Sequence, residues 1–178
     1  MRIISGKFKG RLFTVPKNFA GRPTTDFARE GLFNMLGATL NFSGLATLDL
    51  FSGTGAFSLE CHSRGASRIQ AVELNALHVK FIQQNFKDFE ATAAKALKAD
   101  VKSFLNKPAT ETYDLVFADP PFDLEWLPSL PDMVLQSGVL APDALFILEH
   151  PKEHTFESHP QFEKHRAYGH VHFSFFRP

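Results

Sequence analysis

The fold is decided by the stretch Ala46-Thr47-Leu48-Asp49-Leu50-Phe51-Ser52-Gly53-Thr54-Gly55. Its first six residues form an apolar run that predicts a buried strand, and a helix is expected directly after it, over 56–64. Two glycines one residue apart let the backbone turn sharply and approach a ligand closely. The turn is not the G-x-G-x-x-G of dinucleotide-binding enzymes, because position 58 is Ser. The carboxylate of Asp49 opposes a pyrophosphate and suits a cation or an amine.

Strand and helix patterns alternate from this stretch to residue 149. The predicted strands are 46–51, 68–73, 95–98, 113–118 and 144–149, and the predicted helices are 56–64, 76–89, 101–106 and 127–137. This alternation predicts an α/β fold with right-handed crossovers and a mostly parallel sheet covered by helices on both faces. Two further strands, 162–168 and 170–176, are expected to form an antiparallel pair joined at Gly169.

The first thirty residues differ from the rest of the chain in pattern and charge. Residues 1–20 alternate and contain turn residues, which predicts a basic β-hairpin of strands 2–5 and 11–15. Thr25 or Asp26 is expected to cap a helix with apolar residues between 27 and 36. Residues 1–30 hold seven basic and two acidic residues, a net charge of +5, although the whole chain is neutral. Such an arm indicates either a nucleic-acid contact or a solvated edge hairpin.

The composition is that of a globular protein. With 178 residues, 44% hydrophobic and 21% charged, the chain predicts a single domain, 1–178, made of a hairpin arm (1–22) and a core (23–178). The lone cysteine, Cys61, excludes an internal disulfide and a cysteine-based zinc site and fits a reducing cytoplasm. No signal peptide and no 18-residue apolar run is found, so we expect a cytoplasmic protein without a membrane segment.

Four successive predicted strands each end in an acidic residue, at Asp49, Glu73, Asp100 and Asp119. Ligands of open α/β sheets bind outside the carboxyl ends of the strands, so these side chains are expected to surround one site. An acid in the position of Glu73 suits the two hydroxyls of a ribose, and Asp100 suits an adenine amine. The alternative is that each acid caps a helix.

The loop Asp119-Pro120-Pro121-Phe122 follows the fourth of these strands. Neither proline has an N–H, so the loop is stiff and rich in acceptors. Such a loop suits a planar base with an exocyclic amine, whose protons are accepted by Asp119 and a backbone carbonyl while the ring stacks on Phe122. The alternative is a turn that ends the strand and exposes a phenylalanine.

Together these motifs resemble the RsmD family of class I methyltransferases, whose members methylate the exocyclic N2 of one guanine in bacterial 16S ribosomal RNA. The resemblance covers nearly the whole chain and weakens after Pro151. Small departures are Ser52 and Thr54, where the family often has Ala and Ser, and Cys61-His62. The resemblance rests on residues 1–6 with 9–11, on 22–26 with 29–30 and 32–34, on 49–55 with 60 and 63–66, and on 119–122.

The resemblance implies a Rossmann-like, seven-stranded and mostly parallel sheet of order 3-2-1-4-5-7-6, with the last strand antiparallel and an N-terminal β-hairpin extension. It implies S-adenosylmethionine as cofactor and S-adenosylhomocysteine as product. The implied cofactor-binding residues are Asp49, Phe51, Gly53, Gly55, Glu73, Leu74, Asp100, Val101 and Asp119. The implied catalytic loop, which holds the guanine, is Asp119, Pro120, Pro121 and Phe122. The implied RNA contacts are Lys7, Lys9, Arg11, Arg22, Thr24, Thr25 and Arg29.

The expected partner is ribosomal RNA, a small ribosomal subunit or an assembly intermediate, and a monomer is expected. No metal is expected, because the histidines at 150, 154, 170 and 172 lack an acid or cysteine to complete a ligand set. The catalytic loop serves exocyclic amines broadly, so an adenine-N6 or other amine methyltransferase on DNA, RNA or protein is an open alternative. A nucleotide-dependent oxidoreductase is disfavoured by the missing third glycine. A non-catalytic RNA-binding or assembly factor is disfavoured by the four acids.

Overall fold

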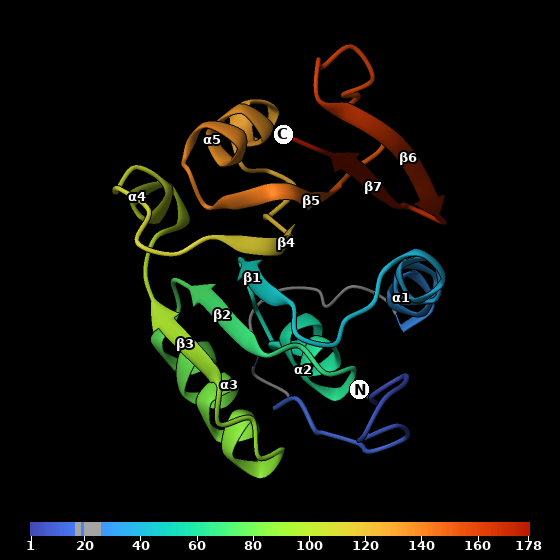
Figure 1. Ribbon diagram of the computed structural model, residues 1–178, viewed down its shortest axis with the longest axis vertical. Helices are drawn as coiled ribbons and strands as arrows, with labels where there is room; N and C mark the ends of the chain where they lie inside the picture. Colours follow the sequence, from blue (N-terminus) through green and yellow to red (C-terminus); the bar gives the residue numbers. More distant parts are fainter. Residues whose placement is uncertain (17–18, 20–25) are drawn as a thin grey trace.

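Seven strands form one sheet in this computed structural model, which describes residues 1–16, 19 and 26–178. Along the sheet the order is β3-β2-β1-β4-β5-β7-β6, as the resemblance to the RsmD family implied (Figure 1). Strands β1 to β5 pair in parallel, and β7 is antiparallel to both β5 and β6. The strands are β1 Ala46–Leu50, β2 Arg68–Glu73, β3 Ala94–Lys98, β4 Tyr113–Ala118, β5 Leu140–His150, β6 Phe162–Tyr168 and β7 Val171–Phe176.

Strand β5 begins four residues earlier than predicted. Its first residue, Leu140, pairs with Tyr113, and the register then shifts before Leu115 pairs with Leu145. Asp143 lies within the shifted stretch with φ of 61°, a left-handed conformation. The neighbouring Pro142 breaks the alternation of apolar residues in the sequence, so the pattern alone indicated only the regular second half of the strand.

Helices cover both faces of the sheet (Figure 1). One face carries α1 (Asp26–Thr39), α2 (Ala56–Ser63) and α3 (Ala76–Asp88), and the other carries α4 (Val101–Leu105), the 3₁₀ turn η1 (Leu127–Ser129) and α5 (Leu130–Gln136). The single helix predicted over 127–137 is therefore divided in two. Pro131 has no N–H to donate to a carbonyl one turn earlier, which explains the break.

Two hydrophobic cores lie on the two faces of the sheet. Successive residues of β4 alternate between them, with Leu115 and Phe117 on the side of α1 to α3 and Val116 on the side of α4 and α5. Phenylalanines fill the first core, where the rings of Phe57 and Phe117 stack with centroids 4.3 Å apart. This packing fixes the start of α2 against the centre of the sheet, next to the ends of β1 and β4.

The predicted N-terminal hairpin is present but its strand pairing is short. Its two sides share one antiparallel bridge, between Arg2 and Leu12, and a few backbone hydrogen bonds, such as that from Ile3 N–H to the Arg11 carbonyl at 2.9 Å. The turn of the hairpin bonds instead to the end of α2, where Lys7 N–H donates to the Ser63 carbonyl at 2.7 Å. The hairpin is thus docked on the body of the protein.

Cys61 is fully buried on α2, as expected for a structural residue. Within the described ranges, no helix has both the length and the apolar composition needed to span a membrane. The same residues contain no group of three or more histidine, cysteine or acidic side chains placed to hold a metal ion.

Candidate active site

A cavity of about 1220 Å³ opens at the carboxyl ends of the central strands, where the four strand-end acids were expected to meet. All four acids line it, together with the glycine turn after β1 and the loop after β4. The α1 helix and the turn between β6 and β7 complete its wall. The predicted site residues that line this cavity are Arg29, Asp49, Phe51, Gly53, Glu73, Leu74, Asp100, Val101, Asp119, Pro120, Pro121 and Phe122.

The glycine turn has the backbone geometry that its sequence predicted. Phe51, Gly53 and Gly55 have positive φ angles of 58°, 51° and 73°. Gly55 is the N-cap of α2 and does not line the cavity, and a Cβ added there would lie 3.0 Å from Ile82. The hydroxyl of Ser52 donates to the Asp49 carbonyl at 2.6 Å and closes the turn. The loop is therefore rigid and leaves the backbone of residue 53 open toward the cavity.

Glu73, at the end of β2, holds the glycine turn in place. Its carboxylate accepts hydrogen bonds from the backbone N–H groups of Gly53 at 2.9 Å and Asn75 at 2.8 Å. The side chain of His78 lies 3.7 Å from the same carboxylate. These contacts fix the orientation of the Glu73 carboxylate at the cavity wall, and each oxygen keeps a lone pair for a further donor.

Asp49, at the end of β1, is buried beneath the cavity with 1% of its surface exposed. It accepts hydrogen bonds from the hydroxyl of Ser58 at 2.7 Å and from the Ser58 N–H at 3.3 Å. Burial raises the pKa of Asp49 to about 7, against the lowering effect of these bonds, and the nearby carboxylates of Asp119 and Glu73 raise it further. A cationic ligand group beside Asp49 would restore its charged form.

Asp100 serves as a helix cap, the alternative reading of a strand-end acid. Its carboxylate accepts a hydrogen bond from the Ser103 N–H at 2.8 Å at the start of α4. The side chain is exposed and still lines the cavity, and Val101 beside it is 3% exposed. A capping carboxylate has a second oxygen, so the cap leaves an acceptor at this corner of the cavity.

The loop after β4 turns tightly over the cavity. Asp119 N–H donates to the Leu50 carbonyl at 3.3 Å, and Leu124 N–H donates to the Pro121 carbonyl at 3.0 Å. Asp119 is half-buried, whereas the ring of Phe122 is 44% exposed at the mouth. The loop thus brings the carboxylate of Asp119 and the ring of Phe122 to the same cavity.

Comparisons with known proteins agree with this geometry. The family model described as "Conserved hypothetical protein 95" matches residues 1–177. Ribosomal RNA small subunit methyltransferase D (RsmD) of Escherichia coli strain K12 is 33% identical over 160 residues, which are 90% of this chain and 79% of that protein. The chain belongs to the RsmD family. The resemblance drawn from its motifs is thereby confirmed.

Two further relatives support membership of the RsmD family. The putative rRNA methyltransferase YlbH of Bacillus subtilis is 32% identical over 156 residues, covering 86% of this chain and 84% of that protein. The solved structure of the putative methyltransferase yhhF from Escherichia coli superimposes with a TM-score of 0.86 at 30% identity, covering 99% of this chain and 97% of that chain. The Rossmann-like class I methyltransferase fold is therefore shown for this chain.

Several lining residues of this RsmD-family cavity were missed from the sequence. Glu149, at the end of β5, is 2% exposed, and the strand-end rule that found the other acids applies to it equally. The ring of Phe19 stacks on His78 with centroids 3.7 Å apart, and both line the cavity. The turn from Tyr168 to Val171 closes the opposite side, although the matching motifs weaken after Pro151. The local sequence does not indicate that Phe19 and His78, or the turn from Tyr168 to Val171, line the cavity.

The turn at Tyr168 depends on a close approach to α1. Gly31 faces the Tyr168 ring, and a Cβ added at Gly31 would lie 2.2 Å from Tyr168 Cε1. Phe27, one turn earlier on α1, meets the same ring edge-on with centroids 6.1 Å apart and is 69% exposed at the cavity. A larger residue at position 31 would push the C-terminal hairpin away from the site.

The residues expected to contact RNA fall into three groups. Lys7, Lys9 and Arg11 are exposed on the docked hairpin, where Arg11 donates to the Asp88 carbonyl at 2.8 Å. Arg22, Thr24 and Thr25 lie outside the described residues. Arg29 is 4% exposed and lies in the wall of the cavity, so it does not share a surface with the hairpin lysines.

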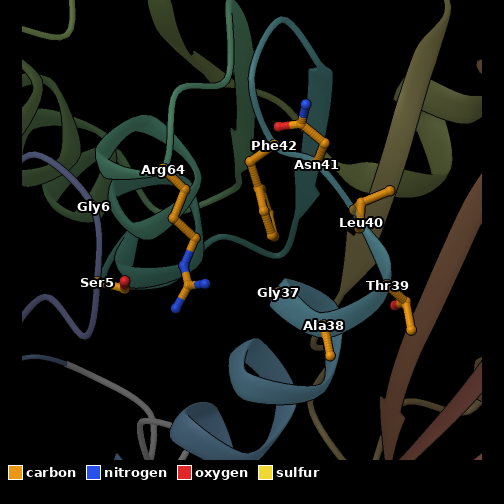
Figure 2. Close-up of a pocket in the computed structure, with 9 residues that line it drawn as sticks. All are labelled: Ser5, Gly6, Gly37, Ala38, Thr39, Leu40, Asn41, Phe42 and Arg64. Atoms are coloured by element: carbon orange, nitrogen blue, oxygen red, sulfur yellow. The ribbon is translucent and has the colours of Figure 1, made fainter.

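A second cavity, of about 510 Å³, lies between the hairpin and the end of α1, away from the strand-end acids (Figure 2). Arg64 is the charged residue in its lining, and Figure 2 shows this side chain extended from α2 toward Gly37. The guanidinium is already bonded to Glu60 at 2.7 Å and lies over the ring of Phe33. The charged side chain of this lining is therefore already bonded, and none of the four strand-end acids lines this cavity, so the larger cavity is the candidate active site.

Proposed function

We propose that this protein transfers the methyl group of S-adenosylmethionine to the exocyclic N2 of a guanine in 16S ribosomal RNA. As an RsmD-family protein it is an S-adenosylmethionine-dependent rRNA methyltransferase. Beyond this activity, the proposal names the target base, the atom that is methylated and the residues that bind the cofactor and the base. The observation that carries it is that the loop of residues 119–122 lies on one cavity with the glycine turn and the acids of β1, β2 and β4.

The cavity fits the cofactor in size and in charge. Its volume of about 1220 Å³ exceeds the roughly 300–1,000 Å³ of common small-molecule sites and leaves room for a nucleobase beside the cofactor. Glu73 would accept from the ribose hydroxyls with the lone pairs that its contacts to Gly53 and Asn75 leave open. Asp100 would accept from the adenine amine, and Leu74 and Val101 would enclose the adenine ring. Asp49 would face the methionine ammonium.

The bound cofactor supplies an activated methyl group on a sulfonium, so the protein has only to align and desolvate the amine. The N2 lone pair of guanine is delocalised into the ring and is a poor nucleophile. Asp119 and the Pro120 carbonyl would each accept one N2 proton, which favours a tetrahedral nitrogen. The same two acceptors would stabilise the positive charge that develops on N2.

The new N–CH₃ bond forms as the S–CH₃ bond breaks, and the sulfur retains the bonding electrons as a neutral thioether. Asp119 would accept the N2 proton late, after the nitrogen has become cationic. Phe122 would stack on the guanine once the base has left its helix or loop. Because Pro120 and Pro121 carry no N–H, the loop presents acceptors and no competing backbone donor to the amine.

The decisive experiment maps the methyl group. Isotope-labelled S-adenosylmethionine is incubated with the protein and either undermethylated small ribosomal subunits or naked 16S ribosomal RNA, and the RNA is digested to nucleosides. We expect label in N2-methylguanosine, in the naked RNA, in the subunit or in both, with the enzyme acting as a monomer. Label in N6-methyladenosine would instead establish the adenine alternative. Absence of label despite cofactor binding would leave a non-catalytic RNA-binding factor.

A further inference from the structure

Arg29 differs from the other residues that line the cavity, because it is a buried cation with unused donors. It lies on α1 with 4% of its surface exposed. Its Nη2 donates to the Arg2 carbonyl and to the Asp26 carboxylate, each at 2.8 Å. Its Nε and Nη1 are shielded from solvent, and no described residue accepts a hydrogen bond from either nitrogen.

A guanidinium has five N–H donors, and the contacts of Nη2 use two of them. The three N–H groups on Nε and Nη1 of Arg29 are shielded from water, and none of the residues that the structure describes supplies them with an acceptor. Such donors cost free energy, and an acceptor from a ligand would remove that cost. The acceptor must be reachable from the cavity, because Arg29 lines it.

The charges around the cavity indicate which acceptor this is. Among the described lining residues Arg29 is the only lysine or arginine, and the carboxylates outnumber it. S-adenosylmethionine carries two cationic groups, the sulfonium and the ammonium, and one anionic group, the carboxylate. One cation among several acids is the complement of this ligand. The carboxylates that line the cavity are those of Asp49, Glu73, Asp100, Asp119 and Glu149.

We propose that Arg29 binds the α-carboxylate of the cofactor through its Nε or Nη1 donors; this inference rests on the proposed function. Arg29 shares a face of α1 with Leu32 and Phe33, which also line the cavity, and Ala56 at the start of α2 lines it too. This wall therefore lies beside the start of α2, where the Asp49 carboxylate bonds to Ser58. Asp49 and Arg29 would together recognise the two charges of the methionine part.

A phosphate of the RNA is the other anion that Arg29 might be expected to meet, and burial argues against it. A phosphate backbone approaches over a surface, where Lys7 and Lys9 are exposed, whereas Arg29 is nearly inaccessible from outside. The carboxylate of a small ligand enters the cavity together with the rest of the molecule. The test below separates the two anions.

The experiment is calorimetric titration with three ligands that differ in the methionine part. S-adenosylhomocysteine has the carboxylate and the amine, S-adenosyl-3-thiopropylamine lacks only the carboxylate, and 5′-methylthioadenosine lacks both. We expect Arg29→Gln to weaken binding of S-adenosylhomocysteine about tenfold to hundredfold, the loss typical of a charge-assisted hydrogen bond. The affinities for the two ligands without a carboxylate should change by less than about twofold. Arg29→Lys should recover part of the loss because it restores the charge. Arg2→Gln, which removes an exposed arginine paired with Glu30, is the matched control.

Equal weakening of all three ligands by Arg29→Gln would overturn the proposal, because it would show a purely structural role. Unchanged ligand binding with weaker RNA binding and a flatter salt dependence would overturn it in favour of a phosphate contact. If Arg29→Gln does not fold, the wild-type protein still decides, since equal affinity for the first two ligands would refute a carboxylate contact. A wild-type protein that binds none of the three would refute the proposed function itself, whatever the role of Arg29.

Discussion

The carboxylate of Glu60, on α2, accepts a hydrogen bond from the backbone N–H of Ile4 at 2.7 Å. The same carboxylate accepts from Ser5 N–H at 3.0 Å and from the Arg64 guanidinium at 2.7 Å, and Glu60 is fully buried. Residues 56 positions apart are thus joined inside the protein. This carboxylate therefore helps to hold the basic hairpin on the body of the protein.

We expect Glu60→Gln to lower the free energy of unfolding by about 3 kcal/mol or more. The substitution leaves Arg64, whose side chain is 11% exposed, without its counter-charge. The new amide NH₂ also replaces one of the two oxygens that accept from the backbone N–H groups of Ile4 and Ser5. Urea denaturation followed by circular dichroism measures this change. Glu30→Gln, which breaks an exposed ion pair with Arg2, is the control and should cost less than about 1 kcal/mol. Similar losses for the two variants would contradict a supporting role for Glu60.

The sheet could be predicted from the sequence because its central strands, such as β4 and the second half of β5, are local apolar runs, and parallel strands with helical crossovers leave few topologies. The docking of the hairpin could not be predicted. Glu60 belongs to one of the matching family motifs, but no local pattern states that its partners are Ile4 and Ser5. Nearly every residue carries the same backbone N–H group. The sequence therefore does not indicate which N–H groups will donate to the buried carboxylate of Glu60.

Asp119→Ala is expected to reduce turnover by about 10²-fold or more, as does removal of other preorganised polar groups at reaction centres. Binding of S-adenosylhomocysteine should change little, because Asp49, Glu73 and Asp100 remain. Single-turnover methylation and calorimetry measure the two effects separately. Asp123→Ala, an exposed acid in the same loop region, should keep nearly full activity. Near-normal turnover of Asp119→Ala would remove Asp119 from the mechanism.

Charge reversal at Lys7 and Lys9 is expected to weaken RNA binding and to flatten its salt dependence. Each lost phosphate contact should reduce the slope of log K against log salt by about 0.7 to 0.9, the values for single strands and for duplex DNA. Filter binding across a salt series measures the slope. Lys107→Glu, which changes an exposed lysine beyond α4 on the other face of the sheet, is the matched control. An unchanged slope in the Lys7 and Lys9 variants would show that the hairpin only protects an edge.

The four acids of the candidate site could be predicted because each of them follows the end of a strand. The four acids meet because the carboxyl ends of parallel strands lie at one edge of the sheet. The sequence could not distinguish how each acid is used, since Asp100 also caps α4 and Glu73 also holds the backbone of Gly53. Arg29 was grouped with the RNA contacts because its charge was visible in the sequence and its burial was not.

His150 is expected to make the protein less stable in mild acid. Its Nδ1–H donates to the Pro151 carbonyl at 2.9 Å and its Nε2 accepts from the Ser174 hydroxyl at 2.8 Å, so the ring is neutral. Burial lowers the pKa of His150 to about 4, whereas an unfolded histidine has a pKa near 6.5. Between these values the unfolded chain binds one more proton, so stability falls as the pH falls from 6.5 to 4.

Urea denaturation between pH 4 and pH 7 measures this dependence on His150. His150→Asn keeps a donor and an acceptor but cannot be protonated, so its free energy of unfolding should fall less steeply with acidity than that of the wild type. Equal slopes for wild type and His150→Asn would show that His150 does not contribute to the pH dependence.

Asp49 should make cofactor binding depend on pH as well. Its pKa is raised to about 7 by burial, so in the empty site it is mostly protonated below that pH and mostly charged above it. Only the charged form attracts the ammonium of S-adenosylhomocysteine. The affinity for this ligand should therefore rise as the pH is raised from 5.5 to 7.5, by at most about tenfold per pH unit.

Calorimetric titration at several pH values tests this expectation with two ligands. Binding of 5′-methylthioadenosine, which has no ammonium, should stay nearly constant over the same range, because Asp49 then has no cation to attract. Asp49→Asn keeps the hydrogen bond from the Ser58 hydroxyl but has no titrating carboxyl, so it should weaken S-adenosylhomocysteine binding and flatten its pH dependence. A pH dependence that persists unchanged in Asp49→Asn would show that another group titrates. The ammonium would then need a different carboxylate, and Glu149, which is buried and lines the same cavity, is the candidate.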